Sequence, residues 1–334
     1  MNSSEKRMCG CLLLIFTFFF SVFSQARISF LQRKEAEAVV LSVSADVQNL
    51  RIRKAGIVQG DYTSSSFQQE NLQERLEQYK REVRDFSDED RNTVTDYVQT
   101  VDSILKTEFP LLLQVPWKFV LVSDSLESFL PDTRDGHIIL SQNLVKKLKN
   151  WSGKKSSSFF TGLELLLNDK IHILQKMNPA PFESFYKEVW GFRKVTSTAT
   201  HKLLQECLPL NSSRPEWVIR ISSRENMYIL PALILEDSSK GTMQSVGIIM
   251  DSTPKGFFPR MSKDGKFEYR DLNLIGQYRE RFPHSEYNYH PDELSADLLA
   301  KYLVRKYLSS RYGTASAKKN EYSRIDKLIR YFRN

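Results

Sequence analysis

The feature that most constrains the fold is the scarcity of cysteine, taken together with the pattern of the first residues. Lys6 and Arg7 precede a short apolar run, residues 11–23, and Ser24-Gln25-Ala26 offers small residues at the spacing that signal peptidase requires. The run is shorter than the roughly 20 apolar residues of a membrane span. We therefore expect a cleavable signal peptide over residues 1–26 and a secreted or periplasmic mature protein. An uncleaved N-terminal anchor is the alternative.

Cleavage leaves Cys207 as the only cysteine. An exported chain with one cysteine forms no internal disulfide, so packing alone must hold its core together. About 300 residues remain, enough for one large domain or two modest ones. We expect no transmembrane span in the mature protein, because no other stretch is long and apolar enough.

The charge balance argues against a nucleic-acid partner. The chain has 48 Lys and Arg against 40 Asp and Glu, a formal net charge of +8. The basic residues form only small clusters, at 146–149, 154–155 and 318–319, and no basic stripe is interleaved with aromatic residues. No pattern in the sequence indicates an oligomeric state.

Periodicity and turn signals predict grouped helices and strands and no regular alternation of the two. Helices are expected over residues 67–86, 87–108, 143–150, 158–177 and 291–309, and from residue 321 onward. Strands are expected over residues 117–123, 137–141, 217–222, 227–235 and 243–251. Ser87 and Asp90 form a capping box at the start of the second helix. This grouping predicts an α+β fold.

Three segments follow from this pattern. Residues 1–26 are the signal peptide, and residues 27–110 form an N-terminal extension in which the helices of 67–86 and 87–108 pack as a hairpin. Residues 111–334 form an α+β domain with a small mixed sheet and a central helix over 158–177.

That central helix carries the most informative pattern in the chain. In "LLLNDKIHIL" (residues 165–174), Asn168 and His172 are four residues apart and therefore share a face, with Asp169 one step around the helix. Far downstream, "HPDELSAD" (residues 290–297) places Glu293 and Asp297 on one face at the start of another helix.

These two stretches resemble the gluzincin branch of zinc metallopeptidases. That family binds zinc through the two histidines of His-Glu-x-x-His and through the glutamate of a downstream Glu-x-x-x-Asp. The context also resembles exported bacterial proteins of this type, because His172-x-x-Gln175 and Asn178-Pro179 are followed by "FESFYKEVWGF" (residues 182–192). The resemblance covers about residues 156–303 and implies a zincin-like fold.

This chain differs from the family at two positions that perform its chemistry, one zinc ligand and the catalytic glutamate. Asn168 replaces the first histidine ligand, and a neutral amide oxygen is a poor ligand for zinc. Asp169 replaces the catalytic glutamate and is one methylene shorter. The implied metal ligands are therefore His172, Glu293 and Asn168, with Asp169 at the catalytic position. We expect zinc to bind weakly or not at all.

The resulting hypothesis is an inactive metallopeptidase-like protein that acts as a binding or scaffold module and holds a peptide or protein in its cleft. A second hypothesis is an active metallohydrolase that uses His172, Glu293 and a substitute ligand, namely Asn168, Asp169 or His290. A third is an unrelated exported structural or adhesive domain, in which His172 is a core histidine and Glu293 is a first-turn acid favoured by the helix dipole.

Overall fold

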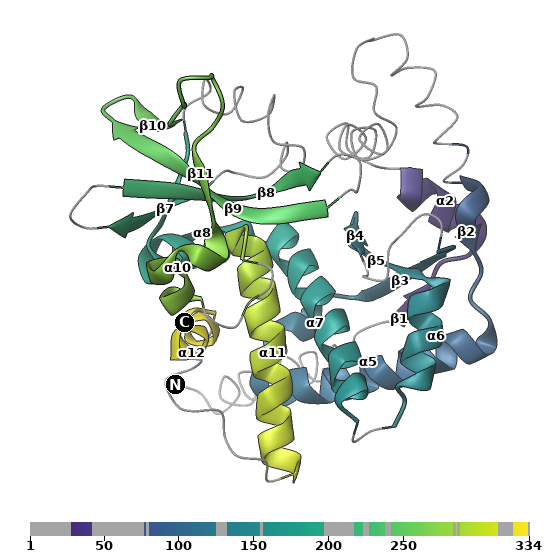
Figure 1. Ribbon diagram of the computed structural model, residues 1–334. Coiled ribbons are helices and arrows are strands. Elements are labelled where there is room, and N and C mark those ends of the chain that lie inside the picture. Colours follow the sequence, from purple (N-terminus) through teal and green to yellow (C-terminus); the bar gives the residue numbers. More distant parts are fainter. Residues whose placement is uncertain are drawn as a thin grey trace, which may run out of the picture.

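The computed structural model describes residues 28–41, 77, 80–124, 132–153, 156–196, 217–222, 227–237, 242–282, 285, 288–312 and 323–332. These residues form an α+β structure with two β-sheets separated by a group of helices (Figure 1). Among them, no helix combines the length and apolar character needed to cross a bilayer. The signal peptide predicted over residues 1–26 lies outside the described part of the chain.

The first sheet, sheet A, is mixed. Its strands are β1 (Ile28–Phe30), β2 (Val83–Arg84), β3 (Trp117–Val122), β4 (Asp132–Arg134) and β5 (His137–Ser141). β3 pairs in parallel with β1 and β5, and β2 pairs antiparallel with the end of β3 beyond β1. β4 turns back antiparallel on β5 and ends the strand order β1-β3-β5-β4.

β3 is apolar except for Lys118, as is typical of a strand whose two faces are both buried. Phe119 and Leu121 face the main core, whereas Val120 and Val122 face a smaller cluster on the opposite side. The smaller cluster is covered by helix α2 (Arg33–Leu41), which contributes Ala36, Val39 and Val40. Sheet A is therefore a layer between α2 and the main helical core.

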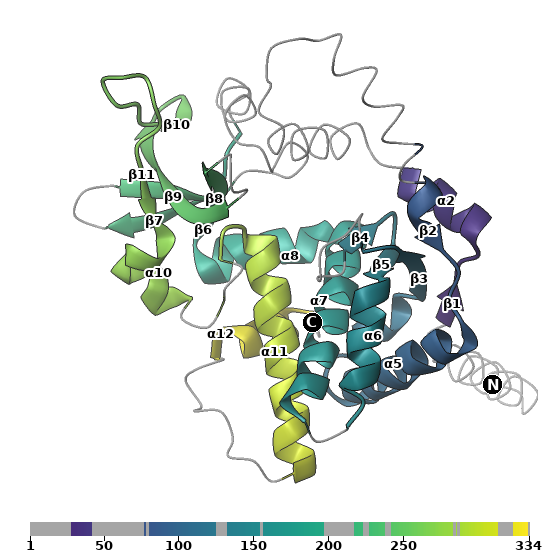
Figure 2. The same cartoon turned by 45° about the vertical axis from the view of Figure 1, so that its right-hand side comes forward.

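The second sheet, sheet B, is antiparallel and lies over the N-terminal end of helix α11 (Figures 1 and 2). Its strands are β6 (Phe192–Lys194), β7 (Trp217–Ser222), β8 (Met227–Asp237), β9 (Thr242–Thr253), β10 (Gly256–Pro259) and β11 (Tyr269–Asp271). Ile219, Ile229 and Ile249 face the main core, and alternate residues such as Val218 and Ile248 form a second apolar cluster. This alternation is the period of two expected for a strand.

The helices fill the space between the two sheets. They are α5 (Asp88–Glu108), α6 (Gln142–Asn150), α7 (Ser157–Met177), α8 (Pro179–Phe185), α10 (Gly276–Arg281), α11 (Pro291–Tyr312) and α12 (Ser323–Tyr331). Short helical turns occur at η1 (Pro110–Gln114), η2 (Tyr186–Trp190, a single π-helical turn) and η3 (Leu272–Leu274). α7 and α11 lie side by side in both views (Figures 1 and 2).

Most of the predicted elements are confirmed. The capping box is present, since the Ser87 hydroxyl accepts from the Asp90 N–H and the Asp90 carboxylate accepts from the Ser87 N–H. The helices predicted over 143–150, 158–177 and 291–309 correspond to α6, α7 and α11, and the five predicted strands correspond to β3, β5, β7, β8 and β9.

The helix predicted over residues 67–86 is wrong at its end. Val83 and Arg84 form β2, because pairing with Val122 and Leu121 buries Val83 completely inside sheet A. Most of the earlier residues of that prediction lie outside the described part of the chain, and so does the proposed hairpin partner of α5. β1 and β2, which precede the boundary predicted at residue 110, pair with β3, and α5 contributes to the main apolar cluster.

Candidate functional site

The candidate site is built on α7, the central helix of the core. Ser156 caps its N-terminus by accepting a hydrogen bond from the Phe159 N–H, at 3.1 Å. The helix ends at Asn178, since Pro179 cannot continue it and starts α8 instead. The second half of α7 is buried almost all round, including the polar residues Asp169, His172 and Gln175. Buried polar side chains in such a helix need partners from neighbouring elements.

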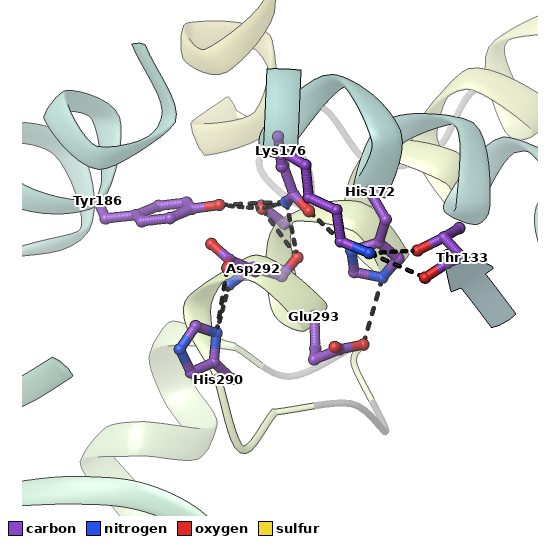
Figure 3. A network of polar contacts seen from close by, with 9 residues as sticks. Thr133, His172, Lys176, Tyr186, His290, Asp292 and Glu293 are labelled. Atoms are coloured by element: carbon purple, nitrogen blue, oxygen red, sulfur yellow. Dashed lines mark hydrogen bonds and ion pairs between the residues drawn. The ribbon is translucent and has the colours of Figure 1, made fainter. Parts of the chain in front are cut away.

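α11 supplies the first of these partners. Its opening turn carries Glu293, and the packing of α11 against α7 brings this carboxylate to His172 (Figure 3). The distance from His172 Nε2 to Glu293 Oε2 is 3.3 Å, and the two side chains are only 8% and 17% exposed. The structure therefore brings together the two candidate ligands that are most distant in the sequence.

The hydrogen bonds of Gln175 determine which ring nitrogen of His172 carries the hydrogen, and therefore the state of the nitrogen that faces Glu293. The Gln175 Nε2 atom lies 2.9 Å from the Asp292 carbonyl oxygen, which can only accept, so the amide nitrogen must point there. Gln175 Oε1 then faces His172 Nδ1 at 2.7 Å, and Nδ1 must carry the hydrogen. In the neutral ring, the lone pair of Nε2 would face the Glu293 carboxylate. The pair is therefore favourable only when a proton or another cation lies between Nε2 and Oε2.

A buried network holds Gln175 in this orientation. Besides the Asp292 carbonyl, its amide nitrogen contacts the Ser295 hydroxyl at 2.9 Å and the Tyr186 hydroxyl at 3.2 Å. The Tyr186 and Ser295 hydroxyls also bond to each other at 2.7 Å. Burial, reinforced by the nearby Asp292 carboxylate, raises the pKa of Tyr186 far above its ordinary value, so the phenol keeps its proton. The network connects α7, η2 and α11 through neutral groups.

The residues present fit only part of a zinc site. A separation of 3.3 Å between Nε2 and Oε2 would let one ion lie at roughly 2.0–2.1 Å from both atoms with an angle of about 107°, close to tetrahedral. A catalytic zinc ion, however, needs three protein ligands and an open position. In the described ranges, no group of three or more His, Cys, Asp or Glu side chains is placed to hold a metal ion. Among the described residues, His172 and Glu293 therefore supply two of the three protein ligands that a catalytic zinc ion needs.

The residues that differ from the gluzincin pattern, Asn168 and Asp169, lie on α7 close to His172 in the sequence. Asn168 lies one turn before His172 and is half-buried, whereas Asp169 is 4% exposed. Asp297, the last residue of the Glu-x-x-x-Asp stretch, forms an ion pair with Lys301 at 3.0 Å. Both of its carboxylate oxygens lie within hydrogen-bonding distance of the Lys301 amine. With Asn168 in place of histidine, Asp297 takes part in an ion pair within α11.

His290 is the other candidate ligand, and its Nδ1 is already used. Nδ1 accepts the Asp292 N–H at 3.2 Å in the first turn of α11, and the ring is 2% exposed. The same nitrogen lies 3.6 Å from a carboxylate oxygen of Asp292, so these contacts hold the His290 ring at the first turn of α11.

The sequence indicated where the supporting network lies, but not what it does. Gln175, Tyr186 and Ser295 all fall within the three stretches that carry the gluzincin resemblance. Their role depends on the crossing of α7, η2 and α11, which no local pattern predicts.

Comparison with models of protein families, with curated proteins and with solved structures finds no match. These comparisons therefore do not identify a family for the chain.

Proposed function

We propose that this protein is an exported, zincin-like binding module that holds an extended peptide or protein segment and does not hydrolyse it. The observation that carries the proposal is the 3.3 Å contact between His172 Nε2 and Glu293 Oε2 across α7 and α11. In a gluzincin these positions supply two of the three zinc ligands, so their convergence supports a related scaffold. The residues missing from the family pattern are those that perform its chemistry.

Loss of hydrolysis follows from the residues that remain. Asn168 offers a neutral amide in place of an imidazole ligand, and Asp169 carries its carboxylate on a side chain one methylene shorter than glutamate. A carboxylate displaced by about 1 Å from the water that it must deprotonate costs on the order of 100-fold in rate. With the ligand count also reduced, the side chains at the site can share a proton or a weakly held cation, but they lack the arrangement for activating water.

The second candidate function is a metallohydrolase, and one observation favours it. The spacing of His172 and Glu293 is that of two ligands at a tetrahedral centre. Such an enzyme would need a third ligand from Asn168, Asp169 or His290. The same experiment distinguishes the two functions.

The experiment measures the zinc content of the purified protein by mass spectrometry and its hydrolysis of fluorescently labelled casein. His172→Ala serves as the matched control. We expect far less than one equivalent of zinc, no hydrolysis above background, and no change in either on substitution of His172. About one equivalent of zinc that a chelator removes together with hydrolysis, and whose return restores hydrolysis, would refute the binding-module proposal in favour of the enzyme.

A further inference from the structure

A hollow on sheet B, where the chain passes from β10 to β11 along β9, lies apart from the site on α7 and α11. Its volume is about 350 Å³, within the range of roughly 300–1,000 Å³ that is usual for ligand pockets. Its walls include Met227, Ile249, Arg260, Glu268 and Arg270. β10 and β11 lie at the end of sheet B that is far from sheet A (Figures 1 and 2). The hollow shares no residue with the His172–Glu293 contact or its network, so it is a separate candidate site.

The pairing of β9 places two opposite charges of the hollow on one face of the sheet. The Ile249 N–H donates to the Glu268 carbonyl oxygen at 2.8 Å, and Arg270 pairs with Gly247. Paired residues share a face of a sheet, and so do residues two apart along a strand. The Glu268 and Arg270 side chains therefore lie on the face of Ile249. Because Ile249 belongs to the main core and Met227 packs against that core, this face offers an apolar floor beside the two charges.

Both charged side chains are available to a ligand. Glu268 and Arg270 are exposed, and neither side chain forms an ion pair or a hydrogen bond with another residue in the part of the chain that the structure describes. Arg260, the other cation of the hollow, is held by the Asp251 carboxylate, whose two oxygens lie 3.1 Å and 3.3 Å from the Arg260 Nε. Residues two apart along a strand are separated by about 6.8 Å, which leaves room for a group that contacts both charges.

We propose that this hollow binds the zwitterion of a free α-amino acid with an apolar side chain. The carboxylate of the ligand accepts from the Arg270 guanidinium, which favours two parallel hydrogen bonds to such a group. The ammonium group of the ligand donates to the Glu268 carboxylate, and its side chain lies on Met227 and Ile249. A simple anion would be repelled by Glu268 and a simple cation by Arg270, so a ligand that carries both charges matches the pair best. This inference does not depend on the proposed peptide-binding function.

The experiment titrates the full-length, isotope-labelled protein with leucine and follows the chemical shifts in its NMR spectra. Three analogues test the three parts of the ligand separately. N-acetylleucine lacks the ammonium group, leucine amide lacks the carboxylate, and glycine lacks the apolar side chain. Each analogue should bind more weakly than leucine.

Two variants test the assignment to the hollow. Arg270→Gln and Glu268→Gln each remove one charge and keep a polar side chain. We expect each to weaken leucine binding roughly tenfold, the usual effect of losing a hydrogen bond to a charged group. Arg279→Gln and Glu280→Gln, at exposed positions of α10 outside the hollow, are the matched controls and should leave the affinity unchanged. Thermal unfolding verifies that each variant is folded.

The expected result is saturable binding of leucine by the wild type and weaker binding by both variants of the hollow. Absence of leucine binding by the wild type would overturn the site. Equal binding of N-acetylleucine or leucine amide would overturn recognition of the two charges, and equal binding of glycine would overturn the apolar floor. Unchanged affinity in both Arg270→Gln and Glu268→Gln would overturn the assignment of leucine to this hollow. All of these outcomes leave the proposed function at His172 and Glu293 untouched.

Discussion

A buried lysine of α7 offers a quantitative test of how the core is built. Lys170 is fully buried, its amine donates to the Val115 carbonyl at 2.6 Å, and it lies 3.8 Å from the centre of the Trp117 ring. Burial lowers the pKa of Lys170 to about 7, against the opposing attraction of the Asp102 carboxylate. The perturbation is Lys170→Met, which keeps the length of the side chain and removes the titrating group.

The sign and size follow from linkage between protonation and folding. Between the folded pKa of about 7 and the ordinary value of 10.5, the unfolded chain binds more protons than the folded one, so stability rises with pH. The full shift corresponds to about 5 kcal/mol at one pKa unit per roughly 1.4 kcal/mol. Below pH 7 Lys170 is protonated in both states, so its cost to the free energy of unfolding is constant. Between pH 7 and pH 9 the free energy of unfolding rises by about 2 kcal/mol.

The assay is urea unfolding of the wild type and of Lys170→Met at pH 7 and pH 9. Other titrating groups are common to both proteins, so they cancel in the comparison. We expect the free energy of unfolding of the wild type to rise by about 2 kcal/mol more than that of the variant over this interval. The same pH dependence in both proteins would refute the reasoning, because Lys170 would then titrate alike in the folded and unfolded chains.

Three further substitutions test the packing and the caps through their urea midpoints. In Gly162→Ala the new methyl group would lie 2.5 Å from Tyr97 Cε1 and 2.9 Å from Leu148 Cδ2, so we expect a loss of about 1–3 kcal/mol. An unchanged or higher urea midpoint would show that Tyr97 and Leu148 can move to accommodate the methyl group. Ser87→Ala removes the cap of α5 and should cost about 1 kcal/mol, whereas no change would mean that the cap contributes nothing. Gln175→Met leaves buried groups of the network without their partner and should cost about 3 kcal/mol; a loss below about 1 kcal/mol would contradict the network.

Local signals explain why the helices could be predicted from the sequence. The capping box of Ser87 and Asp90 and the Asn178-Pro179 stop depend on residues a few positions apart, and both mark real ends of α5 and α7. The strand β3 could also be predicted, because five of its six residues are aromatic or aliphatic, as expected for a strand buried on both faces.

What could not be predicted depends on contacts between distant segments. Val83 follows residues with a helical pattern, yet it forms β2, since pairing with Val122 buries it. Nothing local marks Lys170 as buried either, because a lysine next to Asp169 is typical of a solvated face. For the site, the sequence named His172 and Glu293, but their contact and the role of Gln175 arise only from the packing of α7 against α11.

We propose that α7 and α11 resemble a gluzincin site in which one ligand and the catalytic glutamate are replaced by Asn168 and Asp169. Calorimetric titration of zinc into the parent and into the double variant Asn168→His with Asp169→Glu tests it most directly, with Asp169→Glu alone as the control. Position 168 shares a helix face with His172, and Glu293 already lies 3.3 Å from that histidine. We expect the double variant to bind zinc more than about 100-fold more tightly than the parent and the single variant, because three good ligands replace two. Equal, weak binding by all three proteins would mean that positions 168, 172 and 293 do not converge on one ion, and would contradict the account.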